Sequence, residues 1–162
     1  MGVVIRPAVA EDVSDLAILN RLVQEAHVRA EPAYFRADYR HEQVEGFFRR
    51  LLLAENFTVL LAKISDISIG YLWFETQVRP DNIFKFSLRR IYIHHIAVSE
   101  GAQRKGVGVA LVRAVEAEAE ARGIAHVAVD TWSFNANAQA FFQRLGFEPF
   151  NIAMRKVLPG SA

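Results

Sequence analysis

The sequence predicts a mixed α/β fold in which helices cover both faces of a central, mostly antiparallel sheet. Two apolar segments, 57–64 and 67–75, are separated only by Ser65 and Asp66 and therefore indicate an antiparallel hairpin. A third segment, 89–98, is followed by an amphipathic helix and another strand, which predicts a right-handed parallel crossover. Helical segments before and after these strands supply the cover that both faces of such a sheet need.

The N-terminal part of the chain predicts one strand and two helices. Residues 3–5 are a short β-branched run that Pro7 ends, which indicates a strand. Apolar residues recur at helical spacing over residues 11–28, and acidic residues occupy the first turn, as a helix N-terminus prefers. A second helix is expected over 43–54, where apolar side chains again form one face. Pro32 interrupts the aromatic-rich connector between them.

The C-terminal part completes the predicted order of elements. Residues 107–122 are the clearest helix, and Gly123 stands at the position where helices commonly end. A strand over 125–131 and a short helix over 135–144 follow. The alternating apolar segment 152–158 predicts a last strand, which would lie at an edge of the sheet.

The composition is typical of a globular protein and excludes several classes of function. Of the 162 residues 52% are hydrophobic and 23% are charged, and no repeat or linker interrupts them, so we expect a single globular domain over 1–162. The formal charge of +1 predicts neither a nucleic-acid nor a membrane partner. The chain has no cysteine, which excludes disulfides, thiolate zinc sites and a cysteine nucleophile. Without a signal-peptide pattern or a long apolar run, we expect a cytoplasmic protein.

The hexapeptide QRKGVG, residues 103–108, lies at a strand-to-helix junction. The N-terminus of a helix presents N–H groups without helical partners, and its dipole favours an anion such as a phosphate. Gly106 and Gly108 permit close approach to the main chain, and Arg104 and Lys105 add positive charge. Ligands of open α/β sheets bind outside the carboxyl ends of the strands, where this loop is expected. The sequence therefore predicts a phosphate-bearing ligand.

Two nucleotide-binding loops fit this segment less well. The phosphate loop of nucleotide triphosphatases requires Lys followed by Ser or Thr, whereas the stretch from Gly101 to Gly106 is followed by Val-Gly. The dinucleotide fingerprint requires a third glycine that the segment after Gly108 lacks. Asp130 stands near the spacing of the acidic residue in that fingerprint, so this second alternative stays open.

The segment IAVSEGAQRKGVGVAL, residues 96–111, resembles the coenzyme A signature of the GNAT N-acetyltransferase superfamily, whose core is Gln/Arg-x-x-Gly-x-Gly/Ala. The later NANAQAFFQRLGF resembles the family's second hallmark, an Asn followed eleven residues on by Gly-Phe. The opening IRPAVAEDVSDL is similar to the family's first strand and helix. The resemblance spans essentially the whole chain in the right order. It implies a sheet that splays apart between the parallel strands 89–98 and 125–131 to admit the cofactor.

The resemblance also implies the cofactor and its contacts. Acetyl-CoA would be the cosubstrate, with no metal. The main chain of Ile96, Ala97 and Val98 would pair with the pantetheine arm as an added strand, and the Val98 N–H would polarise the thioester carbonyl. Asn135 would bond to the pantetheine or pyrophosphate region. The pyrophosphate would lie on the backbone of Gln103, Arg104, Lys105, Gly106, Val107, Gly108 and Val109.

The implied reaction is direct attack of a primary amine on the thioester through a tetrahedral intermediate. The acceptor would be a small-molecule or peptide amine. Family members commonly carry a tyrosine, which protonates the departing thiolate, four residues before Gly146. Here that position is Phe142, which is counted among the expected cofactor contacts. The role of protonating the thiolate is therefore vacant or is filled from elsewhere, for example by water. An acyl-CoA-binding regulatory module without catalysis is therefore the alternative, and a homodimer is the expected assembly.

Tyr92, His94 and His95 are the candidates for handling the proton of the amine. Tyr92 stands where some family members carry a glutamate, and an imidazole titrates near neutral pH. Strand alternation puts Tyr92 and His94 on one face and His95 on the other, unless a bulge, frequent in this strand of the family, shifts the pattern. The alternative is that the histidines are hydrogen-bonded in the sheet and only line the acceptor cleft. Likewise Tyr34 and Tyr39 either roof that cleft or pack on the sheet.

Overall fold

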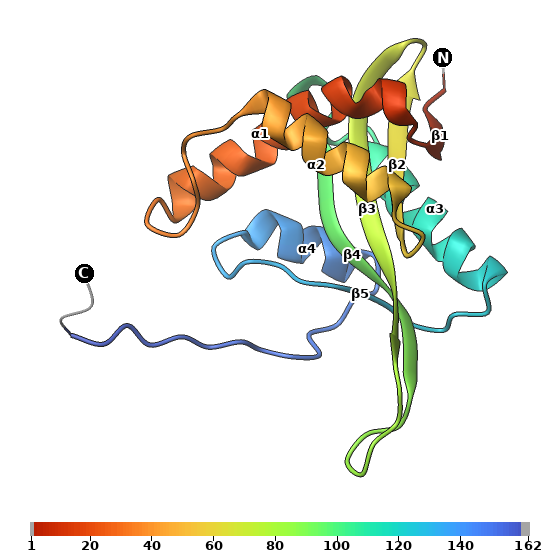
Figure 1. The fold of residues 1–162 in the computed structure, drawn as a ribbon, viewed down its shortest axis with the longest axis vertical. Coiled ribbons are helices and arrows are strands. Elements are labelled where there is room, and N and C mark those ends of the chain that lie inside the picture. Colours follow the sequence, from red (N-terminus) through yellow and green to blue (C-terminus); the bar gives the residue numbers. More distant parts are fainter. Residues whose placement is uncertain (1, 160–162) are drawn as a thin grey trace. The chain divides into compact units, whose positions relative to one another are not determined.

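The computed structural model describes residues 2–159, which form two compact units, one ending at Asp130 and the other beginning at Thr131. In the first unit, five strands form one sheet in the order β1-β2-β3-β4-β5 (Figure 1). Neighbours from β1 to β4 are antiparallel, and β4 and β5 are parallel. This mixed, mostly antiparallel sheet is the predicted one. The strands are β1 Val4–Pro7, β2 Phe57–Ile64, β3 Ile67–Arg79, β4 Leu88–Val98 and β5 Val127–Val129.

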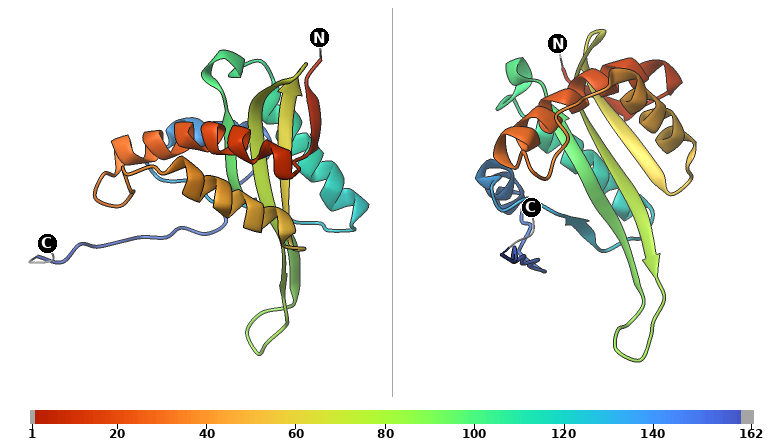
Figure 2. Two further views of the ribbon diagram at one scale, coloured as in Figure 1. Left: turned by 45° about the horizontal axis from the view of Figure 1, so that its top comes forward. Right: turned by 60° about the vertical axis from the view of Figure 1, so that its left-hand side comes forward.

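Helices cover both faces of this sheet, as predicted. Helices α1 (Val13–Ala30) and α2 (His41–Leu53) pack together on one face, and α3 (Val107–Ala121) lies on the other (Figure 2). The helix predicted over 11–28 starts as a short 3-10 turn, Ala10–Asp12, before α1 begins. Apolar residues of α1 and α2, such as Leu16 and Phe48, are fully buried and form one core with sheet residues. The helical periodicity thus located the faces that pack.

A partly buried ion pair fixes the start of α1 against β1. The guanidinium of Arg6 donates to both carboxylate oxygens of Asp12, over 2.7 and 2.8 Å, and the N–H of Val9 donates to the same carboxylate over 2.8 Å. The hydrogen bonds from Arg6 lower the pKa of Asp12 despite its burial. Asp12 thereby provides a hydrogen-bond acceptor for the backbone N–H of Val9, where the chain turns from the strand into the helix.

Strands β3 and β4 continue beyond the rest of the sheet as a long hairpin (Figure 1). Strand β2 pairs with β3 only up to Glu75, whereas β3 and β4 remain paired to Arg79 and Leu88. The side chains at its tip are mostly exposed. No helix among residues 2–159 has the length and apolarity needed to cross a membrane.

The second unit holds one helix, α4 (Ala136–Arg144), as expected near 135–144. The last strand, predicted over 152–158, is wrong: these residues belong to no helix or strand and are exposed. The alternating pattern there predicted a strand, but a strand also needs a hydrogen-bonded neighbour, and these residues pair with none of the described strands. The strand predicted over 125–131 is shorter, since only Val127–Val129 pair with β4. A single domain over 1–162 stays a prediction.

Candidate functional site

A β-bulge in β4 places both histidines of the IYIHHIAV segment on one face of the sheet. Trp73 of β3 pairs with His95, and the next residue, Phe74, pairs with Ile93, so His94 is the extra residue of the bulge. The His94 ring stacks on Trp73, and the His95 ring stacks on Tyr71, two residues earlier on the same face of β3. The simple alternation, which put His95 on the opposite face, is therefore wrong because the bulge shifts it.

Beyond this bulge, one edge of β4 has no neighbouring strand. Strand β5 pairs only with Ile91 to Ile93, and no described strand continues that pairing towards Val98. The Ser99 N–H donates to the Ile69 carbonyl on the β3 side over 2.9 Å. Because backbone groups alternate in direction along an antiparallel strand, Ala97 also faces β3, and Ile96 and Val98 face the open edge. That edge can accept an extended chain of hydrogen-bonding groups.

The loop after β4 leads to an uncapped helix N-terminus. Gly106 is the N-cap of α3, has a left-handed backbone with φ 83°, and no side chain caps the helix there. A Cβ atom on Gly106 would meet no heavy atom within 4 Å, so the space before the helix is open. The first N–H groups of α3, on Val107, Gly108 and Val109, have no acceptor within a helix. Arg104, which also has a positive φ of 59°, lies exposed just before them.

The loop between β4 and α3 is tied to the open edge of β4 and carries positive charge. The Gln103 side-chain amide donates to the Val98 carbonyl over 3.1 Å and so ties the loop to the open edge of β4. The Val98 N–H remains directed at that edge. Lys105 is exposed, so its ammonium is available to an anion in solution. The loop and the edge together offer main-chain donors and positive charge to a long, phosphate-bearing ligand.

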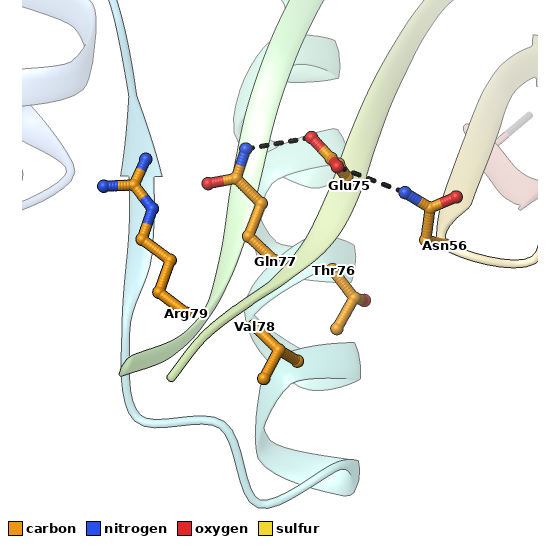
Figure 3. A pocket seen from close by; sticks show the side chains of 6 residues that line it. All are labelled: Asn56, Glu75, Thr76, Gln77, Val78 and Arg79. Atoms are coloured by element: carbon orange, nitrogen blue, oxygen red, sulfur yellow. Dashed lines mark hydrogen bonds between the residues drawn. The ribbon is translucent and has the colours of Figure 1, made fainter. Parts of the chain in front are cut away.

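His94 is held by a carboxylate that the sequence did not single out. Its Nε2 lies 2.9 Å from Oε2 of Glu75, which also accepts from the side-chain amides of Gln77 (2.9 Å) and Asn56 (3.1 Å) (Figure 3). Burial opposes ionisation of Glu75, but the hydrogen bonds from Gln77 and His94 outweigh it and lower the pKa. An ionised carboxylate can only accept, so Nε2 of His94 carries the hydrogen, and in the neutral ring Nδ1 has a free lone pair.

Glu75 opens onto a cavity on the exposed part of the β3–β4 hairpin. The cavity has a volume of about 420 Å³. Six residues line it: Asn56, Glu75, Thr76, Gln77, Val78 and Arg79 (Figure 3). Apart from Val78, these side chains are polar, so the cavity suits a hydrophilic molecule better than an apolar one.

Tyr92 is next to this cluster and is engaged by a second carboxylate. Its hydroxyl donates to Oδ2 of Asp130, and its ring stands edge-on to the His94 ring, with centroids 4.8 Å apart. Burial, followed by the Asp130 carboxylate, raises the pKa of Tyr92 to about 12. Tyr92 is therefore a hydrogen-bond donor at neutral pH and not a base.

His95 belongs to a separate, buried hydrogen-bond network. Its Nδ1 lies 2.5 Å from the hydroxyl of Tyr71, which also accepts from the side-chain amide of Asn20 over 2.9 Å. Burial lowers the pKa of His95 to about 4, and the neighbouring His27 and His94 act in the same direction. His95 is thus neutral and structurally held.

The aromatic connector between α1 and α2 shows one of the two behaviours that were expected of it, which is packing, and the roof over an acceptor cleft stays a prediction. The hydroxyl of Tyr39 donates to the Ala17 carbonyl over 2.5 Å, so Tyr39 packs onto α1. Tyr34 is 63% exposed and its ring stands edge-on to Phe35, which stacks on His27. Tyr34 is thus the most exposed aromatic side chain of this connector.

Two predicted site residues belong to the second unit. The Asn135 side chain accepts from the Ala138 N–H over 3.0 Å and so caps α4. Phe142 is buried and stands edge-on to Phe141 and Phe147. Their proposed contacts with a cofactor remain predictions.

Sequence reasoning missed Glu75 and Asn56, and it considered Asp130 only for a different motif. A signal for Glu75 was present, because it is the only charged residue in the predicted strand 67–75. A charge in an otherwise uncharged strand needs a partner. The partner itself, His94, was not predictable because it lies on another strand. No group of three or more residues able to hold a metal ion occurs among residues 2–159.

Comparison with known proteins was made on sequence and on fold. No curated protein sequence matches this chain. Many solved structures share the fold, among them the following three. A tetramutant of protein BH1408 from Bacillus halodurans has a TM-score of 0.88 at 23% identity and covers 96% of this chain and 99% of its own. A transcriptional regulator from Bacillus halodurans C-125 has a TM-score of 0.77 at 19% identity, with coverage of 97% and 100%.

The third structure is an aminoglycoside N-acetyltransferase, AAC(6')-Iy, in complex with CoA. Its TM-score is 0.74 at 18% identity, and the match covers 98% of this chain and 95% of the other. These identities establish the fold alone. The sequence model of the acetyltransferase (GNAT) family matches residues 19–147, which include the open edge of β4, the Gly106 loop and Asn135. The chain therefore belongs to the GNAT acetyltransferase family.

Proposed function

We propose that this protein transfers an acetyl group from acetyl-CoA to a primary amine. The observation that carries the proposal is the open edge of β4 at Ile96 and Val98, which leads directly into the uncapped N-terminus of α3 at Gly106. Such an edge fits the amide groups of a pantetheine arm, and such a helix N-terminus fits a pyrophosphate. Membership of the GNAT family supports both assignments.

When bound, acetyl-CoA supplies an acetyl group activated as a thioester. The backbone N–H of Val98 would donate to the thioester oxygen, where negative charge develops during attack. The loop from Gln103 to Val109 would hold the pyrophosphate through main-chain N–H groups, and Arg104 and Lys105 would add charge. Ala97 would contribute packing, since its main-chain groups face β3. Asn135 and Phe142 keep their expected cofactor contacts as proposals.

His94 is the proposed base. The amine nitrogen would bond to the acetyl carbon to give a tetrahedral intermediate, and the proton of the amine would pass to Nδ1 of His94. The carbon–sulfur bond would then break, the carbonyl would re-form, and sulfur would leave as the CoA thiolate. Glu75 holds Nε2 and stabilises the imidazolium that results. Tyr92 would act as a positioning residue, because its edge contact limits the motion of the His94 ring. Phe142 occupies the position where family members commonly carry a tyrosine, and no other residue in this proposal takes over its role. Water would therefore protonate the thiolate.

A panel of amines tests this function. Thiol release from acetyl-CoA would be followed over alkylamines, diamines, amino acids and peptides, while CoA binding is measured by calorimetry. We expect release with at least one acceptor class. Binding without release on any amine would contradict acetyl transfer.

That contrary outcome would favour the second candidate, an acyl-CoA-binding regulatory module. Two observations favour it: Phe142 replaces the usual tyrosine, and one structural neighbour is described as a transcriptional regulator. The bonded His94–Glu75 pair favours the enzyme, because a regulatory module has no use for an oriented base.

We also propose that the protein forms a homodimer in the cytoplasm. Its hairpin tip exposes Ile83, Phe84 and Phe86 at 86–95%, and its C-terminal segment exposes Phe150 and Met154 at 93%. In a pair of chains, the three phenylalanines alone would bury about 900–1,500 Å², which approaches the size of a stable interface. Large apolar side chains exposed to this degree often mark an interaction surface.

Light scattering tests the assembly. We expect about twice the chain mass of 18.3 kDa at micromolar concentration. The double variant Phe86→Ser, Phe150→Ser should shift the mass to that of one chain, whereas Val4→Ser, also exposed, should not. A monomeric wild type would refute the dimer. Cell fractionation tests the location.

A further inference from the structure

Polar side chains continue along β3 away from His94. Because side chains alternate along a strand, Glu75, Gln77 and Arg79 share the face of β3 that carries Trp73, while Thr76 and Val78 face the other way (Figure 3). Across the hairpin, Glu75 pairs with Tyr92 and Gln77 pairs with Arg90. The His94–Glu75 pair therefore stands at one end of a polar strip that runs towards two arginines.

The arginines of this strip are not neutralised. Neither Arg79 nor Arg90 forms an ion pair with a carboxylate anywhere among residues 2–159. Arg90 is oriented all the same: its Nε donates to Oε1 of Gln77 over 2.9 Å, and its guanidinium lies over the Tyr92 ring, 4.9 Å from the centroid. Its remaining N–H groups have no carboxylate to bind.

The carboxylates nearby are already occupied. Glu75 accepts from His94, Gln77 and Asn56, and Asp130 accepts from Tyr92. The positive charges of Arg90 and Arg79 both act on the Tyr92 hydroxyl, where they oppose the rise in its pKa that burial causes. The strip thus combines an oriented imidazole at one end with two guanidinium groups that pair with no carboxylate among residues 2–159.

Strand geometry gives the separation between these groups. Arg90 stands two residues, and Arg79 four residues, beyond Glu75 along the hairpin. At about 3.3 Å per residue, these positions lie roughly 7 and 13 Å from Glu75. A guanidinium binds carboxylate and phosphate oxygens through paired N–H groups, which gives both affinity and orientation.

We propose that the acceptor is an amine that also carries an anionic oxygen group, a carboxylate or a phosphate, bound by Arg90 and Arg79. The amine would face His94 while the anionic group lies along the strip, roughly 7–13 Å away. This inference rests on the proposed acetyl transfer and names the class of its acceptor.

Matched acceptors test the charge requirement. Values of kcat/KM would be compared for 6-aminohexanoate, 5-aminopentyl phosphate, hexylamine and 1,6-diaminohexane, which have similar length and differ in the distal group. We expect the two anionic amines to exceed hexylamine at least about tenfold, and the diamine to be the poorest. Whichever anionic amine is better identifies carboxylate or phosphate as the source. Equal values for hexylamine and both anionic amines would overturn the proposal.

Arginine variants locate the effect. Arg79→Gln should lower kcat/KM for the anionic amines, mainly through KM, and should change kcat/KM for hexylamine much less. Arg79→Glu should make 1,6-diaminohexane a better acceptor than 6-aminohexanoate. Arg89→Gln is the matched control, because Arg89 is exposed on the opposite face and bonds to the Arg122 carbonyl. The proposed anion site would be refuted if the Arg79→Gln enzyme and the Arg90→Gln enzyme both kept the full preference for anionic amines.

Calorimetry separates this inference from the proposed reaction. With the protein saturated by CoA, 6-aminohexanoate should bind more tightly than hexylamine, and Arg79→Gln should abolish the difference. If no amine is acetylated but this difference is found, acetyl transfer fails and the anion site stands. If amines are acetylated but no difference is found, the anion site fails alone.

Discussion

The imidazole of His94 lies flat against the indole of Trp73, with ring centroids 4.2 Å apart and planes inclined by only 9°. Its Nε2 is at the same time 2.9 Å from the Glu75 carboxylate. Stacking fixes the plane of the ring, and the hydrogen bond fixes its rotation within that plane. The β-bulge at His94 brings the next residue, His95, to the same face, so the two imidazoles stack on neighbouring aromatic rings of β3.

The first prediction concerns His94. Replacing it by alanine should lower kcat/KM by roughly 10²-fold near neutral pH, because a positioned base commonly contributes that much. The loss should shrink at high pH, where the free amine is abundant. A pH–rate profile measures both effects, and His126→Ala, a change at an exposed position, is the control. Profiles of His94→Ala and wild type that coincide at every pH would assign proton removal to solvent.

The second prediction concerns the loop glycine. Gly106→Glu should nearly abolish binding of CoA in calorimetry, because it places a carboxylate where the pyrophosphate is proposed to lie. Gly123→Glu is the matched control, since Gly123 is also left-handed (φ 63°) and also has open space around its Cβ position. Both changes should cost about 1–2 kcal/mol of backbone strain, but only Gly106→Glu should lose the ligand. Equal affinities for the two variants would place the pyrophosphate elsewhere.

The third prediction concerns the pH dependence of stability. A histidine in the unfolded chain binds its proton near pH 6.5, whereas burial lowers the pKa of His95 in the folded protein to about 4. The unfolded state therefore holds more protons between these values, and the free energy of unfolding should fall as the pH drops from about 6.5 to about 4. His95→Gln should make this decrease shallower in urea titrations, whereas the exposed His126→Gln should not. An unchanged slope in His95→Gln would show that His95 does not contribute.

The fourth prediction contrasts two glycines. A Cβ atom on Gly70 would lie 2.8 Å from the Ala97 carbonyl oxygen, so Gly70→Ala should destabilise the fold by about 1–3 kcal/mol. In Gly46, within α2, the nearest atom is the flexible end of Arg50 at 3.7 Å. Gly46→Ala should therefore stabilise the protein by about 0.5–1 kcal/mol through helix propensity. Denaturant midpoints at constant m value measure both, and shifts of the same sign would contradict the prediction.

Local patterns determined most of the fold from the sequence. The strand predicted over 57–64 has the bounds of β2, and the helix predicted over 107–122 differs from α3 by one residue. In both cases a strong apolar periodicity coincides with clear end signals, so local and tertiary preferences agree. Gly106 has a left-handed backbone conformation, which glycine adopts at little steric cost.

Long-range pairing decided what the sequence could not. The bulge that brings His94 and His95 to one face depends on how β3 and β4 align, and the Glu75–His94 bond joins residues 19 positions apart on different strands. Alternation over 152–158 predicted a strand, but no described strand is available to pair with it. Side-chain period specifies which face a residue prefers, whereas register, bulges and partners arise only when separate segments meet. The sequence by itself thus determined the elements and the glycine-containing loop before α3, and the tertiary structure decided which side chains surround His94.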